Sequence, residues 1–172
     1  EVLATYQGAM ELSAFEFFSE LALQMVVAHQ ELQRPFETPC EYYALLEFEQ
    51  SDDAAMDQAM TLFEHCVEQG WVLDGTVSQS VAQAQNLWRL REDISETITP
   101  WTPYKNDIST LISAVPDFLT EVESVVNSKY PDFEIVWFGH IGDGNVHLNI
   151  LKPDSLSVDE FREQCGEVSK WV

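Results

Sequence analysis

The stretch from Glu134 to Leu151, EIVWFGHIGDGNVHLNIL, constrains the fold more than any other part of the chain. Two runs rich in β-branched and aromatic residues flank a short loop with the sequence Gly142-Asp143-Gly144-Asn145. Glycine allows positive φ angles, and short polar side chains hydrogen-bond their own backbone, so the pattern predicts a β-hairpin. His140 and His147 lie at the two ends of its loop.

These two histidines are candidate metal ligands. Residues that face each other near the closed end of a hairpin have Cβ atoms about 5 Å apart, so two imidazoles there can reach one ion. Neutral imidazole is the commonest metal ligand, and the oxygen-bearing side chains of Asp143, Asn145 and Asn149 can orient or supplement it. A third protein ligand has to come from elsewhere. The alternative is a tight turn whose histidines only hydrogen-bond the loop, and the pattern alone leaves both open.

The segment from His140 to Asn149, HIGDGNVHLN, resembles the signature of the C-terminal domain of FAD-linked oxidases. That family includes D-2-hydroxyglutarate dehydrogenase, D-lactate dehydrogenase and the FAD subunit of glycolate oxidase. Three more segments agree with it in the expected order: SAFEFF (13–18), LWRLRE (87–92) and YKNDIS (104–109). The resemblance implies that residues 1–172 form the substrate-binding, cap-type domain, with an N-terminal FAD-binding domain and a final C-terminal segment lying outside the sequence.

The activity that the resemblance implies is the FAD-dependent oxidation of a D-2-hydroxy acid to the 2-oxo acid. Hydride would pass to the flavin while a divalent metal, with zinc the first choice, holds the α-hydroxyl and the carboxylate. The metal would be bound by His140 and His147. The substrate oxygens would be bound by four residues, Arg91, Ser95, Lys105 and Asn149, and the hairpin loop would be supported by Asp143 and Asn145.

In the resembling family, a glutamate that completes the metal site and a histidine that is a candidate base come from an Ala-Glu-His-Gly segment, which this sequence does not contain. No complete catalytic set is therefore expected here, and the chain alone is expected to be inactive. The implied partners are the 2-hydroxy acid, the protein's own FAD-binding domain and an unidentified electron acceptor, with a homodimer left open.

Two other functions are compatible with parts of the pattern. One is a stand-alone, ferredoxin-like module that binds a metal or a small anion without catalysis. The other is a flavoenzyme domain that acts on a different alcohol, such as an aryl alcohol or an ether-lipid precursor. The histidine pair argues against the second of these, whereas the binding module stays open. Without the resemblance, Arg91 would be taken for an exposed partner of Glu92 or Glu96.

Charge and cysteine content exclude some partners. Thirty acidic residues against eight basic ones give a net charge of −22, which repels phosphate backbones and anionic membranes, so no nucleic acid and no membrane surface is expected as a partner. A pocket for an anionic acid must locally reverse this field, which makes the few basic residues informative. Three cysteines without CxxC spacing favour reduced thiols and an intracellular, most plausibly cytoplasmic, location.

Periodicity and capping signals predict the order of elements. Helices are expected at 13–31, where Ser13 and Glu16 have capping-box spacing, and at 51–69, 78–97, 116–128 and 158–172. Strands are expected at 41–49 and 71–77 and in the hairpin, whereas 1–11 fits a short strand or a loop. This order predicts one α+β domain, ferredoxin-like, with an antiparallel sheet and helices packed mainly on one face.

Overall fold

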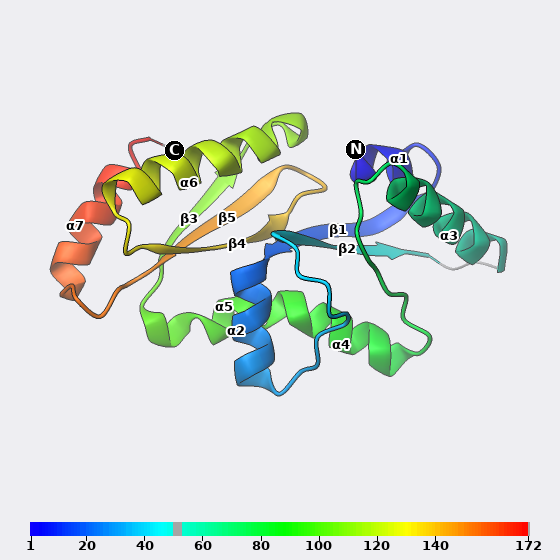
Figure 1. Cartoon of the computed structure of the whole chain (residues 1–172), viewed down its shortest axis with the longest axis horizontal. Coiled ribbons are helices and arrows are strands. Elements are labelled where there is room, and N and C mark those ends of the chain that lie inside the picture. Colours follow the sequence, from blue (N-terminus) through cyan, green and yellow to red (C-terminus); the bar gives the residue numbers. More distant parts are fainter. Residues whose placement is uncertain (50–52, 172) are drawn as a thin grey trace.

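The structure is a computed structural model that describes residues 1–49 and 53–171. Within these residues one five-stranded sheet has the order β2-β1-β4-β5-β3, and each neighbouring pair is antiparallel (Figure 1). The strands are β1 (Leu12–Ser19), β2 (Tyr42–Phe48), β3 (Tyr104–Ser109), β4 (Glu134–His140) and β5 (Asn145–Leu151). The predicted α+β class, the antiparallel sheet and the hairpin of β4 and β5 are confirmed.

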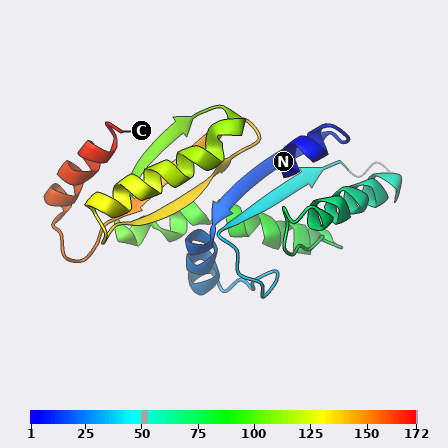
Figure 2. The ribbon, with the colours of Figure 1, turned by 45° about the horizontal axis from the view of Figure 1, so that its top comes forward.

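Helices cover both faces of the sheet. One face carries α2 (Glu20–Gln30), α4 (Val81–Glu92) and α5 (Ile94–Thr97), and the other carries α6 (Val115–Lys129) and α7 (Val158–Val168) over β3, β4 and β5 (Figures 1 and 2). On that second side, α1 (Val2–Gln7) and α3 (Asp53–Glu68) lie over β1 and β2. The distribution is thus more even than the prediction of helices mainly on one face. No helix in residues 1–49 and 53–171 is long and apolar enough to cross a lipid bilayer.

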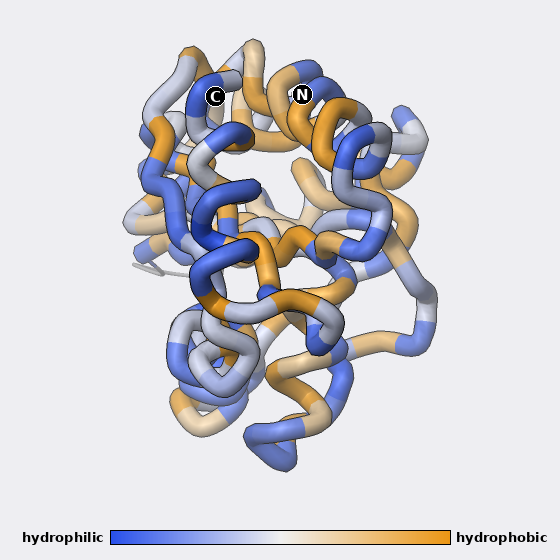
Figure 3. The backbone as a smooth tube through the Cα atoms, turned by 90° about the vertical axis from the view of Figure 1, so that its left-hand side faces the viewer, coloured by the Kyte–Doolittle hydropathy of each residue, from blue (hydrophilic) through white to orange (hydrophobic). Residues whose placement is uncertain are grey.

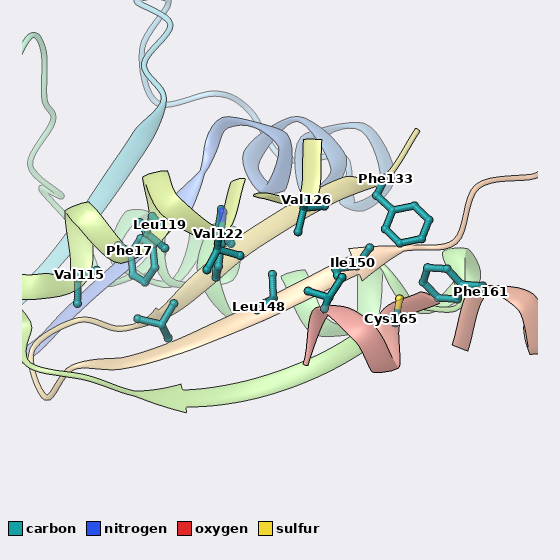
Figure 4. Packing of buried hydrophobic residues seen from close by; sticks show 13 residues of the cluster. Phe17, Val115, Leu119, Val122, Val126, Phe133, Leu148, Ile150, Phe161 and Cys165 are labelled. Carbon is teal, nitrogen blue, oxygen red and sulfur yellow. The ribbon is translucent and has the colours of Figure 1, made fainter. Parts of the chain in front are cut away.

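Two hydrophobic cores lie on opposite faces of the sheet because the central strands are apolar on both sides. In β4, Trp137 belongs to the core under α6 and α7, whereas its neighbours Val136 and Phe138 belong to the core under α2, α4 and α5. Figure 4 shows the first core, in which Leu148 and Ile150 of β5 face residues of α6 and α7. Figure 3 shows hydrophobic residues along the inner strands and hydrophilic ones on the outer turns and loops.

The predicted helix at 13–31 is wrong in its first third. Residues 12–19 form β1, in which Phe15, Phe17 and Phe18 are buried, and bulky aromatic side chains favour such a strand between two covered faces. Helix α2 begins only after Ser19, whose side chain accepts a hydrogen bond from the Ala22 amide at 3.4 Å. The capping-box spacing of Ser13 and Glu16 is therefore coincidental.

Three other segments differ from the prediction: 2–7, 71–77 and 78–97. Residues 2–7 form a helix, and 71–77 form no strand: the Trp71 and Val72 amides bond the Cys66 carbonyl and so cap α3. The helix expected at 78–97 divides at Asp93 into α4 and α5, with Ser80 as its N-cap. Residues 51 and 52, where the helix at 51–69 was expected to begin, lie outside the described residues. At α7, the Ser157 and Glu160 side chains form a capping box.

The two halves of the sheet meet at a short joint. Strand β1 pairs with β4 at Phe17↔Gly139 and Phe18↔Phe138, whereas β4 and β5 pair along their whole lengths. Position 139 requires glycine because of the neighbouring strand β5: a Cβ atom on it would lie 2.3 Å from the Asn145 carbonyl oxygen. We call these two pairs the β1–β4 joint.

Candidate functional site

The predicted site residues gather on the face of the sheet that α2, α4 and α5 cover. Side chains alternate between faces along a strand. One parity in each strand therefore brings a set of polar and aromatic side chains to this face: Glu16 of β1, Lys105 and Asp107 of β3, Phe138 and His140 of β4, and His147 and Asn149 of β5. Helices α4 and α5 cross the same face and contribute Arg91 and Ser95.

All of these side chains except Glu16 line an open pocket of about 520 Å³. Its walls contain all six residues that the sequence assigned to substrate or metal, together with three that it did not: Arg91, Ser95, Lys105, Asn149, His140 and His147, and then Glu92, Asp107 and Phe138. Segments as distant in the chain as α4 and the hairpin thus meet at one cavity. The roles of these residues stay predictions.

The sequence analysis expected the two histidines to face each other directly. In the structure they are diagonal neighbours on the hairpin instead. His140 pairs with Asn145 and His147 pairs with Phe138, because the loop between the strands has four residues, 141–144. Diagonal side chains on a sheet remain within reach of each other. The two imidazole rings have their centroids 5.5 Å apart and are nearly perpendicular, at 83°.

The loop that carries this geometry is held from both sides. Within it, the Asp143 carboxylate accepts a hydrogen bond from the backbone N–H of Asn145 at 3.0 Å. The Gly142 amide bonds the Phe15 carbonyl of β1, and the Thr110 amide bonds the Gly144 carbonyl, both at 3.0 Å. Gly144 has a φ of 78°, and a Cβ atom on it would lie 2.1 Å from the Thr110 oxygen, so no other residue fits without rearrangement.

Each imidazole is held at Nδ1 by a carboxylate. Glu16 Oε1 lies 2.7 Å from His140 Nδ1, and Asp107 Oδ1 lies 2.5 Å from His147 Nδ1. An ionised carboxylate can only accept, so each Nδ1 carries the hydrogen, and in the neutral ring Nε2 keeps its lone pair. Both rings can therefore offer Nε2 to an electrophile in the pocket.

Sequence reasoning missed both carboxylates. Glu16 had been assigned to a helix cap, and only its place in β1 brings it to His140, which is 124 residues away. Asp107 lies two residues after Lys105, so the two share a face of any strand that contains them. That spacing was the available signal, but the segment 104–109 had not been assigned to a strand.

Arg91 is buried rather than exposed, so the alternative in which it pairs with Glu92 or Glu96 at the surface is wrong. Its side chain is 8% exposed, its Nη2 lies 2.9 Å from Glu16 Oε2, and its guanidinium carbon lies 4.8 Å from the centre of the Phe138 ring. Burial lowers the pKa of Arg91 and the Glu16 carboxylate opposes that shift, so the guanidinium stays charged. Its Nε has no hydrogen-bond partner among the described residues.

Lys105 and Ser95 form a second polar group at the pocket. Lys105 Nζ donates to Ser95 Oγ at 2.9 Å, and both residues are exposed. Lys105 lies across from Asn149, whose side chain is buried and donates to the His147 and Val136 carbonyls at 3.3 and 3.4 Å. Positive charge therefore reaches the pocket from two directions, from α4 and from β3.

The residues present fit part of a metal site. Two imidazoles with fixed Nδ1 hydrogens supply two nitrogen donors of the kind that zinc accepts. Among residues 1–49 and 53–171, no group of three or more His, Cys, Asp and Glu side chains is arranged to hold an ion. The third ligand that the sequence analysis required is therefore not part of this cluster.

Comparison with known proteins identifies relatives over almost the whole chain. Residues 2–172 match the family model described as FAD linked oxidases, C-terminal domain. A D-2-hydroxyglutarate dehydrogenase of Stutzerimonas stutzeri is 60% identical over 171 residues, which is 99% of this chain and 37% of the relative. One from Xanthomonas citri pv. viticola is 51% identical over 170 residues, or 99% and 36% of the two chains.

A putative mitochondrial D-lactate dehydrogenase of Schizosaccharomyces pombe is 31% identical over 174 residues, covering 94% of this chain and 32% of that protein. The chain thus spans roughly a third of the length of the curated relatives it matches. The family match, the level of identity and the hairpin signature agree: the chain belongs to the FAD-linked oxidases and corresponds to their C-terminal domain.

Proposed function

We propose that this chain is the substrate-binding domain of an FAD-dependent dehydrogenase that oxidises a D-2-hydroxy acid to the 2-oxo acid. The observation that carries the proposal is the convergence of two imidazoles and two cationic side chains on one pocket. Arg91 and Lys105 are two of only eight basic residues in a chain of net charge −22, so their meeting here is informative. Family membership and the named relatives support the same activity.

The two cations suit a substrate with two carboxylates. The guanidinium of Arg91 offers planar donors that match a carboxylate, and Lys105 with Ser95 offers an ammonium and a hydroxyl at a separate point of the wall. Relatives named D-2-hydroxyglutarate dehydrogenase act, by that name, on a dicarboxylic hydroxy acid. D-2-hydroxyglutarate is therefore the first candidate substrate of the complete protein.

His140 and His147 would hold a divalent cation through Nε2, with zinc as the first candidate because it accepts imidazole and carboxylate ligands. Such an ion supplies Lewis acidity at the hydroxyl of the substrate, and the flavin accepts the hydride. The chain's own residues orient the substrate: Arg91 and Lys105 bind its carboxylates, and Asn149, whose amide nitrogen donates to backbone carbonyls, has Oδ1 left to accept from the substrate hydroxyl. The FAD-binding domain is the proposed partner.

His147→Ala in the complete protein tests the proposal. We expect metal-dependent oxidation of the 2-hydroxy acid to be lost while the absorbance of bound flavin is retained, since His147 lines this pocket and the FAD-binding domain is the proposed holder of the flavin. His65→Ala is the matched control, because His65 is exposed on α3, away from the pocket. The assay is dye reduction with and without added zinc. Unchanged oxidation in His147→Ala would overturn the proposed role.

The location in the cell stays a prediction. All three cysteines are free thiols; Cys66 and Cys165 are buried and Cys40 is half-buried. Burial raises the pKa of the Cys165 thiol to about 12, which makes it unreactive. Free thiols are compatible with the intracellular location inferred from the sequence.

A further inference from the structure

Glu16 makes two contacts that no assigned role explains. Its side chain is only 6% exposed, and its two oxygens go to different partners: Oε1 lies 2.7 Å from His140 Nδ1, and Oε2 lies 2.9 Å from Arg91 Nη2. Burying a carboxylate costs several kcal/mol unless its charge is matched, and here a single buried guanidinium matches it. Glu16 is not among the residues that line the 520 Å³ pocket, although with His140 it lines a second one of about 320 Å³.

We propose that Glu16 is a shared positioning residue, which orients His140 for the cation and Arg91 for the substrate carboxylate with one side chain. The inference rests on the proposed function and deepens it. Oε1 requires the hydrogen of His140 to be on Nδ1, which leaves Nε2 able to bind an ion. Oε2 holds one arm of the Arg91 guanidinium, while its other nitrogens stay available to an anion.

The position of Glu16 in β1 couples its carboxylate to both the imidazole and the guanidinium. Phe17 and Phe18, which follow it, form the β1–β4 joint, so the backbone of β1 is fixed against β4 next to His140. The ring of Phe138 lies under the Arg91 guanidinium and beside the His147 imidazole, at 4.8 and 4.9 Å. With the joint on one side and this aromatic ring on the other, a shift of the carboxylate moves the metal-binding and anion-binding groups together.

Asp107 provides an internal comparison. It holds His147 in the same manner, through Nδ1, but its side chain is 77% exposed, and among the described residues it pairs with no cation of the pocket. Removing Asp107 should therefore affect the imidazole alone, whereas removing Glu16 should affect the imidazole and the guanidinium. The contrast between the two carboxylates is what the experiment uses.

The test is Glu16→Gln in the complete flavoprotein. A glutamine offers one oxygen, so it can accept from His140 or from Arg91 but not from both. We expect the dissociation constant for zinc, measured by competition with a chelating dye, to rise about 10- to 100-fold. We expect KM for the 2-hydroxy acid to rise as well. Asp107→Asn should weaken zinc binding with a smaller change in KM, and Glu47→Gln, an exposed residue of neighbouring β2, should change neither.

A readout that needs neither metal nor turnover completes the test. In zinc-free protein labelled with ¹⁵N-histidine, the His140 resonances should report hydrogen on Nδ1 in the wild type and a mixture of tautomers in Glu16→Gln. A purely structural role would lower the folded fraction without altering the tautomer, KM or zinc affinity of the folded protein. Glu16→Asp, which keeps the charge beside Arg91, serves if Glu16→Gln does not fold, and the same increases are expected because its shorter arm cannot reach both partners.

Two results would overturn the inference: a folded Glu16→Gln or Glu16→Asp protein with wild-type zinc affinity and tautomer, or one in which KM rises and zinc affinity does not. A wild-type protein that neither binds zinc nor oxidises 2-hydroxy acids would instead overturn the proposed function together with this inference. The behaviour of the wild type therefore tells the two failures apart.

Discussion

At the scale of single residues, the hydrogen bonds and ion pairs within the chain determine which polar atoms of the pocket are left to bind a ligand. Each histidine has one nitrogen engaged by a carboxylate, Asn149 has its amide nitrogen engaged by backbone carbonyls, and Arg91 has one arm engaged by Glu16. What remains for a ligand is a small set of donors and acceptors in fixed directions. Preorganisation of this kind reduces the entropy lost when a ligand binds.

At this scale, we predict that Lys105 discriminates between substrates. Because Lys105 lies on β3 and Arg91 on α4, Lys105→Met should remove the second of two carboxylate contacts. We expect KM for a dicarboxylic 2-hydroxy acid to rise about tenfold, roughly 1.4 kcal/mol, with a smaller effect on kcat. KM for D-lactate, which has one carboxylate, should change little. Steady-state kinetics with both acids measure this.

The control for that experiment is Lys170→Met, because Lys170 pairs with Glu167 on α7, on the other face of the sheet. It removes the same charge from the molecule without touching the pocket. Equal increases of KM for the two acids in Lys105→Met would contradict the assignment of Lys105 to the second carboxylate.

At the scale of elements, the link between β1, α2 and β2 depends on one carboxylate. Glu20, the first residue of α2, accepts two hydrogen bonds from the guanidinium of Arg34, both at 2.9 Å, and a third from the Tyr43 hydroxyl of β2. The hydrogen bonds from Arg34 are the main cause that lowers the pKa of Glu20 from 4.5 to about 2. The charge also lies at a helix N-terminus, where it is favourable.

This shift gives stability a dependence on pH with a definite sign. A carboxyl group whose pKa is lower in the folded chain stabilises it fully above pH 4.5 and loses that contribution as pH falls toward 2. Glu20→Gln should therefore lower the urea midpoint at about pH 6 and flatten its decline between about pH 4.5 and about pH 2.5. Glu163→Gln, on the exposed side of α7, is the control. An equally steep decline in Glu20→Gln would contradict this account.

The elements that could be predicted from the sequence are those whose formation depends on residues nearby in the chain. The hairpin, β2, α3, α6 and α7 are set by residues within a few positions, such as the glycines of the loop or the Ser157 cap, and these were predicted. Strand β1 was not, because Phe15-Glu16-Phe17-Phe18 becomes a strand only between two covered faces. The same nonlocal cause hid Glu16. Of the site, the residues carried by the family signature were predicted, and the carboxylates behind them were not.

At the scale of the whole molecule, the sheet separates stability from the pocket. The core under α6 and α7 contains no pocket-lining residue, whereas Phe138 belongs to the opposite core and to the pocket wall. Large apolar side chains such as Leu148 and Trp137 are fully buried on the first side. Changes there should alter the free energy of unfolding without altering the chemistry of the site.

Leu148→Ala tests this separation. Leu148 is fully buried in β5 and its truncation leaves a cavity, so we expect a loss of about 2 to 5 kcal/mol in the free energy of unfolding. KM and zinc affinity of the folded protein should stay unchanged. Leu73→Ala, at a residue 67% exposed, should change stability by about 0.5 kcal/mol or less. Denaturant titrations and kinetics check both parts; a shift of KM in Leu148→Ala would show that the faces are coupled.

Because the site spans the β1–β4 joint, its geometry depends on how the two halves of the sheet are aligned. Glu16 belongs to one half and His140 to the other, and among the described residues the ladder between β1 and β4 has two residue pairs. A small sliding or opening along this line would pull the carboxylate from the imidazole while both halves kept their hydrogen-bonded ladders. If the proposed cation binds at His140, its affinity would then fall before any strand or helix unfolded, so the contacts that hold the two halves together would also set that affinity.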